Sequence, residues 1–150
     1  MVDFMTNQQR SRAMSRVRGK ETRIELLVRS LLHRKGFRYK NNVLTLPGRP
    51  DIVLPKYKAA VFVHGCFWHG HPGCKLSRLP GSREEFWEQK ISNTSLRDKE
   101  KIAELLSIGW RTAVVWQCVL NNRESVSKTI DVLANWIIYG DNWLEIPNRG

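Results

Sequence analysis

Residues 64–74 impose the strictest geometric requirement in this chain. They hold three of its four histidines and two of its three cysteines. Cys66, His71 and Cys74 are spaced as Cys-x4-His-x2-Cys, and the remaining cysteine, Cys118, lies far downstream after a predicted strand. Three thiols and one imidazole match the Cys₃His ligand set of a closed, tetrahedral structural zinc site. The sequence therefore predicts a bound Zn²⁺.

The three cysteines have two other interpretations, a disulfide with one free thiol and simple burial as small apolar side chains. The odd count and the absence of a secretory pattern argue against a disulfide framework. Burial suits Cys118, which lies in an apolar run, but not Cys66 or Cys74, which stand among Gly, Pro and His. Zinc is the favoured interpretation.

The net charge points to a polyanionic partner. Lys and Arg number 25 against 14 Asp and Glu, which gives +11 in 150 residues and a pI near 10.1. A pI above about 9 is typical of nucleic-acid-binding domains, although a basic, soluble surface is the simpler alternative. No apolar run approaches the roughly 20 residues of a membrane span. We expect a protein of the reducing cytoplasm.

The length predicts one domain, preceded by a basic arm over residues 1–20. This arm is poor in apolar residues, and we expect it to be flexible without DNA and to order on a polyanion. Its phosphate-binding candidates are Arg10, Arg12, Arg16 and Arg18.

Residues 21–150 are expected to form a single α/β domain with a central sheet flanked by helices. Hydrophobic periodicity and turn residues predict helices over 22–36, 83–108 and 125–139, the second with a break at its polar residues 92–95, and strands over 37–40, 51–54, 59–63 and 110–116. The 59–63 strand is apolar throughout and is expected to be central, and the tail after 140 is predicted to be short and mostly polar.

Asp51 is the second candidate for chemistry. A Pro/Gly turn places it at the start of a strand, and the loop with His64 and His69 follows the next strand. A carboxylate with phosphate oxygens and water suits Mg²⁺, and an imidazole can take a proton from attacking water. Alternatively, Asp51 is a turn residue held by local hydrogen bonds.

Four segments together resemble the very-short-patch repair (Vsr) endonucleases over nearly the whole chain. They are residues 46–53 (LPGRPDIV), 61–69 (VFVHGCFWH), 85–90 (EFWEQK) and 109–118 (GWRTAVVWQC). The resemblance implies a restriction-endonuclease-like fold with a mixed sheet and a structural zinc. It also implies Mg²⁺-dependent nicking of duplex DNA 5′ to the thymine of a T:G mismatch, which arises by deamination of 5-methylcytosine.

The resemblance also implies roles for single residues. Asp51 corresponds to the Mg²⁺ ligand and His69 to the general base, while His64 and Glu25 correspond to a supporting pair. Glu25 also fits a capping box with Thr22. Cys66, His71, Cys74 and Cys118 match the zinc ligands. The aromatics that wedge into DNA correspond to Phe67, Trp68 and Trp87, although the helical spacing of Trp87 is equally typical of core packing.

Two positions depart from the family pattern. Val63 replaces a threonine that is common in relatives; its expected Mg²⁺ contact uses the backbone carbonyl, so only a hydroxyl role is lost. The segment from His71 to Cys74 is one residue longer than the expected His-x-Cys spacing, which affects local loop geometry.

The expected partners are double-stranded DNA with a T:G mismatch, a functionally associated DNA cytosine-5 methyltransferase and mismatch-repair proteins, with the protein itself a monomer. Two other functions remain open. One is a restriction-type nuclease without mismatch preference, and the other is a zinc-stabilised DNA-binding module without catalysis, which leaves Asp51, His64 and His69 without a task.

Overall fold

The computed structural model describes residues 22–41 and 43–148. The proposed phosphate-binding residues of the basic arm, Arg10, Arg12, Arg16 and Arg18, lie outside these residues. None of the described helices is long and apolar enough to span a membrane.

A four-stranded mixed sheet forms the centre of the domain. Its order is β1-β2-β3-β4, with β1 antiparallel to β2 and the other two pairs parallel. The strands cover Ile52–Leu54, Ala59–His64, Arg111–Trp116 and Trp143–Ile146. All six residues of β2 are buried, which confirms the prediction of a central apolar strand.

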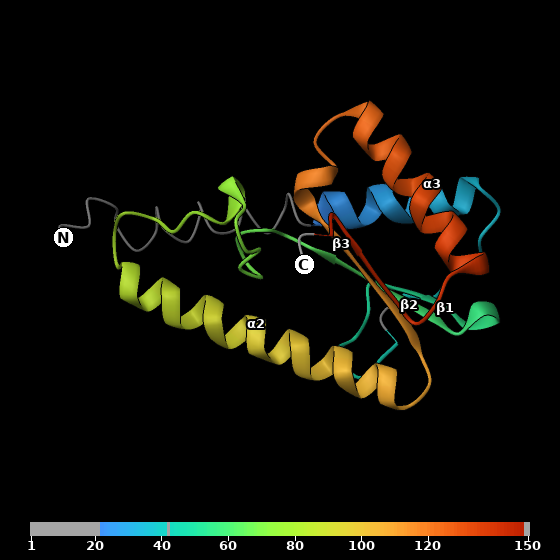
Figure 1. Cartoon of the computed structure of the whole chain (residues 1–150), viewed down its shortest axis with the longest axis horizontal. Coiled ribbons are helices and arrows are strands. Elements are labelled where there is room, and N and C mark those ends of the chain that lie inside the picture. The colour runs from blue at the N-terminus through green and yellow to red at the C-terminus, as the bar shows by residue number, and fades with distance from the viewer. Residues whose placement is uncertain (1–21, 42, 149–150) are drawn as a thin grey trace.

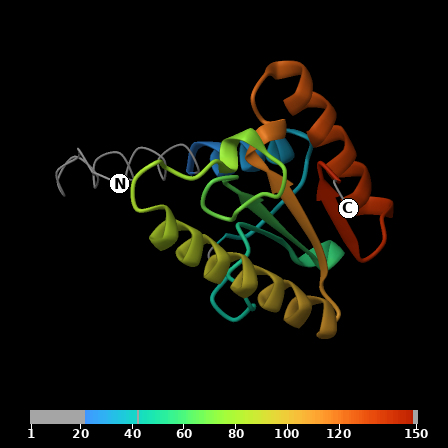
Figure 2. The same cartoon turned by 60° about the vertical axis from the view of Figure 1, so that its left-hand side comes forward.

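Helices cover both faces of this sheet. The helix over residues 22–34 and α3 (Arg123–Tyr139) lie on one face, and α2 (Glu84–Ser107) lies on the other (Figure 1). Side chains alternate along a strand, so Val61 and Val63 pack on the first face while Ala60 and Phe62 pack on the second with Leu105. The turned view in Figure 2 shows the same three layers, with α2 crossing beneath the sheet.

Helix α2 is continuous over 24 residues, so the predicted break at residues 92–95 is wrong. Its polar side chains bond within the helix instead of ending it. The Gln89 amide donates to Asn93 Oδ1 at 3.0 Å, and the Thr94 hydroxyl donates to the Lys90 carbonyl at 3.1 Å. Local side-chain hydrogen bonds of this kind are compatible with a helix when they point back along its own surface.

Two edges of the sheet also differ from the predictions. Residues 37–40 form a single bridge, between Lys40 and Val53, instead of a strand. The C-terminal tail forms β4, which pairs with β3 from Thr112↔Trp143 onward. The tail has four half-exposed or exposed strand residues, and such a short edge strand carries little periodic signal because its pairing depends on the neighbouring strand.

Candidate active site and metal centre

Asp51 is held where β1 begins, beside the end of β2. The Val63 backbone N–H donates to Asp51 Oδ2 at 2.6 Å. Arg29, on the helix over residues 22–34, donates through Nε and Nη2 to the Asp51 backbone carbonyl at 3.1 and 2.9 Å. The turn before β1, the central strand and the N-terminal helix therefore orient this carboxylate together.

Glu25 places a second carboxylate beside Asp51. It hydrogen-bonds to Asp51 and lies 3.8 Å from Arg29 Nη2. Burial, and next the negative charge of Glu25, raises the pKa of Asp51 to about 7. The Val63 hydrogen bond and the positive charge of Arg29 lower this pKa, but their effect is smaller. Two adjacent acids in a partly dry site favour either a shared proton or a bound cation.

His64, the last residue of β2, and His69, in the loop after it, stack face to face. Their ring centroids lie 3.9 Å apart with an interplanar angle of 5°. Burial, and to a smaller extent the neighbouring His69, holds the pKa of His64 well below its ordinary value, so His64 is a neutral imidazole. Its Nδ1 is buried and has no hydrogen-bond partner among the described residues.

Asp98 on α2 completes this histidine group and was not predicted. His69 Nδ1 and Asp98 Oδ2 are 2.6 Å apart. A carboxylate at this distance holds Nδ1 as the protonated nitrogen and leaves Nε2 as an acceptor. Asp98 lies on the helix face of Ile91 and Leu105, both buried. Asp98 stands seven residues from each of them, so it is an acidic residue on the apolar face of the helix. That departure from the apolar pattern is the sequence signal that could have identified it as a functional residue.

A cleft of about 450 Å³ is lined by one member of the carboxylate pair and one member of the histidine group. Glu25 lines it from the N-terminal helix, His69 from the loop after β2, and Lys90 and Arg97 from α2. The cleft therefore combines a carboxylate, an imidazole and two cations. A phosphate diester bound there would meet basic side chains next to a proton acceptor.

The four predicted zinc ligands converge. His71 Nδ1 lies 3.5 Å from Cys66 Sγ and 3.6 Å from Cys118 Sγ, and the ligand atoms of all four residues, Cys74 included, lie within 4.8 Å of one another. A tetrahedral zinc with bonds of about 2.0–2.3 Å requires ligand separations of about 3.5–3.8 Å. The residues fit a zinc ion, and the longer segment from His71 to Cys74 does not remove Cys74 from the group.

The surroundings of this cysteine–histidine group hold it in place. The His71 ring stacks on Trp116 with centroids 4.1 Å apart, and the Cys66 backbone N–H donates to Gln117 Oε1 at 3.2 Å. Burial raises the pKa of the Cys66 thiol well above its ordinary value. Metal ligation requires the thiolate. The positive charge of a bound cation would therefore be needed to deprotonate this buried thiol.

The three proposed wedge aromatics lie together. Ring centroids of Phe67 and Trp68 are 5.2 Å apart, and those of Phe67 and Trp87 are 5.7 Å apart. Trp68 and Trp87 are only 8% and 6% exposed, so core packing accounts for most of the surface of both rings. The Trp68 indole packs against Trp87 at 6.1 Å, and Phe67 is the half-buried member.

The Val63 side chain is 1% exposed and packs in the apolar core. A hydroxyl at this position would face that core, so valine suits its surroundings, while the backbone N–H still contacts Asp51.

Comparison with known proteins identifies close relatives. The family model described as DNA mismatch endonuclease Vsr matches residues 2–75. The chain is 49% identical to the type II nicking enzyme V.XorIIP of Xanthomonas oryzae over 122 residues, which covers 81% of this chain and 89% of the relative. It is 38% identical to the DNA mismatch endonuclease Vsr of Escherichia coli over 152 residues, which covers 100% of this chain and 97% of the relative. It is also 46% identical to the type II nicking enzyme V.NmeAIP of Neisseria meningitidis, covering 91% and 97%.

Proposed function

Because this chain belongs to the Vsr DNA mismatch endonuclease family, we propose that it is a DNA endonuclease that nicks one strand of duplex DNA 5′ to the thymine of a T:G mismatch. The observation that carries the proposal is the His69–Asp98 pair at 2.6 Å, whose imidazole lines a cleft together with Glu25 and two basic side chains. A module that only binds DNA has no need of an oriented imidazole beside half-buried acids. The mixed sheet with helices on both faces supports a restriction-endonuclease-like fold.

The proposed reaction is hydrolysis of a phosphodiester. His69 Nε2 accepts a proton from a water molecule, the water oxygen attacks phosphorus, and the bond from phosphorus to the leaving deoxyribose oxygen breaks. Asp98 keeps His69 in the required tautomer and offsets the positive charge that the imidazole gains. His64, neutral and stacked on His69, limits the movement of the base.

Asp51 and the Val63 backbone carbonyl are the proposed ligands of Mg²⁺, with Glu25 in support. The raised pKa of Asp51 fits this role, because the buried pair of acids favours a cation over two unshielded charges. When bound, Mg²⁺ would polarise the phosphate and stabilise the leaving oxygen. Zn²⁺ on Cys66, His71, Cys74 and Cys118 would be structural, since four protein ligands leave no open position.

The aromatic group next to His69 is the proposed mismatch sensor. Inserting an apolar side chain between base pairs costs a few kcal/mol per step, and a mismatched base costs least to displace. Phe67, backed by Trp68 and Trp87, lies within three residues of the proposed base. A wedge here would couple unstacking at T:G to the position of the catalytic imidazole.

A supercoiled plasmid with one T:G pair tests the proposed function against its alternatives. We expect a single-strand nick with Mg²⁺ that stops in EDTA, and none on the matched plasmid. Cleavage of both plasmids would indicate a sequence-reading nuclease, and no cleavage of either would indicate a binding module. Asp51→Asn serves as the matched inactive variant, since it should keep zinc and mismatch binding.

A 2-aminopurine beside the mismatch tests the wedge. Its fluorescence should rise with the wild-type protein and stay quenched with Phe67→Ala or Trp68→Ala, while nonspecific DNA affinity changes little. Phe86→Ala is the matched control, because Phe86 is 43% exposed and contacts Trp87 but is outside the proposed wedge. Unchanged unstacking and nicking in both wedge variants would mean that these aromatics only pack the core.

A further inference from the structure

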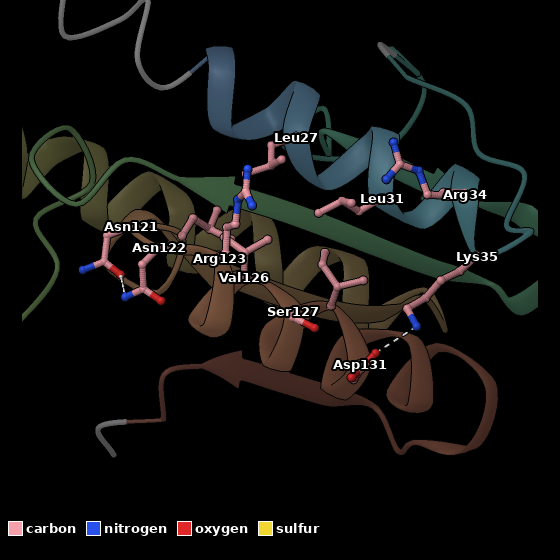
Figure 3. Close-up of a pocket in the computed structure, with 12 residues that line it drawn as sticks. Leu27, Leu31, Arg34, Lys35, Asn121, Asn122, Arg123, Val126, Ser127 and Asp131 are labelled. Atoms are coloured by element: carbon pink, nitrogen blue, oxygen red, sulfur yellow. Dashed lines mark hydrogen bonds and ion pairs between the residues drawn. The ribbon is translucent and has the colours of Figure 1, made fainter.

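A second hollow lies on the opposite face of the N-terminal helix from the catalytic groups. This docking groove has a volume of about 740 Å³ and runs between the helix over residues 22–34 and the first turns of α3 (Figure 3). Along a helix of 3.6 residues per turn, Leu27 and Leu31 stand about 200° from Glu25 and Arg29. One helix therefore presents Glu25 to the cleft and leucines to the groove.

The floor of the groove is apolar. Leu27 and Leu31 point from the N-terminal helix toward α3, which contributes Val126 and Ile130 (Figure 3). Leu31 and Val126 are partly buried against the core, and Ile130 belongs to it. The apolar side chains at this surface are thus continuous with the domain interior and are held by it.

The rim of the groove is basic and only partly neutralised. Lys35 Nζ bonds to Asp131 Oδ1 at 2.8 Å, and Asp131 is the one acid among the lining residues. Arg34 and Arg123 are exposed, and within the described residues neither has an ion pair. Two unpaired guanidinium groups therefore flank an apolar floor, one on each helix.

We propose that this groove docks an acidic amphipathic peptide segment of a partner protein. Leucine-sized side chains at helical i, i+3 and i+4 spacing would fill the floor, and carboxylates at the edges would pair with Arg34 and Arg123, where guanidinium geometry favours bidentate contacts. Charge complementarity selects this occupant over a basic or purely apolar one. The inference does not rest on the proposed nuclease activity.

Such a partner would contact the helix that carries Glu25 and Arg29 on its other face. Its binding would restrict that helix without covering the cleft, so the protein could hold DNA and the partner at once.

Fluorescence anisotropy of the full chain with a fluorescein-labelled probe peptide tests the inference. The probe carries leucines at i, i+3, i+4 and i+7 with glutamates between them, and is measured without DNA or Mg²⁺. We expect saturable binding that weakens at least about tenfold in Arg34→Glu/Arg123→Glu. The control Lys40→Glu/Lys56→Glu changes the net charge equally at exposed sites outside the groove and should bind like wild type.

A probe of opposite charge shows whether the Arg34→Glu/Arg123→Glu variant is folded. The same leucine pattern with lysines in place of glutamates should bind Arg34→Glu/Arg123→Glu and not the wild-type protein. Equal weakening in both double variants would overturn the inference, since it would mean nonspecific attraction to a basic protein. If Arg34→Glu/Arg123→Glu lost as much affinity for matched duplex DNA as for the probe peptide, the inference would also be overturned, because the groove would then be a DNA-binding surface.

Two further measurements test other occupants of the groove. Tighter probe binding after Val2→Ser/Phe4→Ser would show that the chain's own first residues fill the groove. Dimerisation in sedimentation that disappears in Arg34→Glu/Arg123→Glu would show that a second copy fills it. Either result would overturn the proposal of an acidic partner.

Discussion

At the scale of single residues, the chemistry depends on groups whose surroundings change their ordinary behaviour. Asp51 is buried next to Glu25, and His64 is buried against His69. The outcome is a carboxyl group that holds its proton unusually well and an imidazole that stays neutral. Such opposed perturbations within one site are typical of functional groups.

The first residue-scale prediction concerns the orientation of His69. Its replacement by Ala should reduce the nicking rate about 10² to 10⁴-fold, the usual contribution of a general base. Asp98→Asn should cost at least about tenfold, but less than His69→Ala, because an amide oxygen can still accept from Nδ1. Single-turnover nicking measures both, with Glu100→Gln as an exposed control on the same helix. Wild-type rates in Asp98→Asn would remove this residue from the mechanism.

The second residue-scale prediction concerns the pH dependence of folding stability. The folded-state pKa of Asp51 is about 7, above its ordinary 3.8, so the unfolded state loses this proton first. Without Mg²⁺, the carboxyl group therefore destabilises the fold increasingly as pH rises from about 4 to about 7, by on the order of a few kcal/mol. Asp51→Asn should flatten this loss in urea unfolding at pH 5 and pH 8.

Adding Mg²⁺ provides the control. At pH 8 it should stabilise the wild-type protein and leave Asp51→Asn unchanged, because a ligand stabilises only the state that binds it. The same pH slope in both proteins would show that Asp51 ionises normally.

At the scale of elements, the loop after β2 packs closely on α2 at Gly70. Gly70 has φ +62°, and an added Cβ would come within 2.6 Å of Ile91 Cγ2. Gly36 ends the N-terminal helix at φ +101° with no atom within 4 Å of such a Cβ. The two glycines share a left-handed backbone and differ in available space.

This pair gives the element-scale prediction. Gly36→Ala should lower the free energy of unfolding by about 1 kcal/mol, the cost of a left-handed alanine. Gly70→Ala should cost more and also slow nicking, since the loop between His69 and His71 must move away from α2. Urea unfolding and nicking rates measure both effects. Equal losses in the two variants would show that the loop is not packed tightly on α2.

At the scale of the whole molecule, the cysteine–histidine group joins segments that are distant in sequence. Cys66, His71 and Cys74 follow β2, whereas Cys118 follows β3. A zinc ion would tie the ends of the two central parallel strands together and hold the loop that carries His69. Structural zinc in small sites contributes on the order of 10 kcal/mol to folding.

Cys118→Ser should therefore lose zinc and stability together, and lose nicking as a consequence. Elemental analysis should find one zinc per wild-type chain and less than one in the variant, and Asp51→Asn should retain the wild-type content. Soluble, active protein without zinc would refute the structural role.

The sequence by itself was sufficient for the features that short segments encode. The apolar run at 59–63 predicted the central strand, and Gly36 and Gly140 predicted helix ends, because burial and backbone conformation leave local patterns. The candidate metal ligands Cys66, His71 and Cys74 were also readable, since ligand type and spacing are properties of one loop, and the structure brings Cys118 to them. Resemblance to a known family added the proposed roles of Asp51 and His69.

Only the tertiary structure decided which distant groups meet. It paired His69 with Asp98, joined Glu25 to Asp51, added β4 to the sheet and buried Trp68. Each of these contacts joins residues that are separated along the chain, and each depends on how helices pack on a sheet. Periodicity records which face of an element is buried, but the partner across that face is selected by packing of the complete domain.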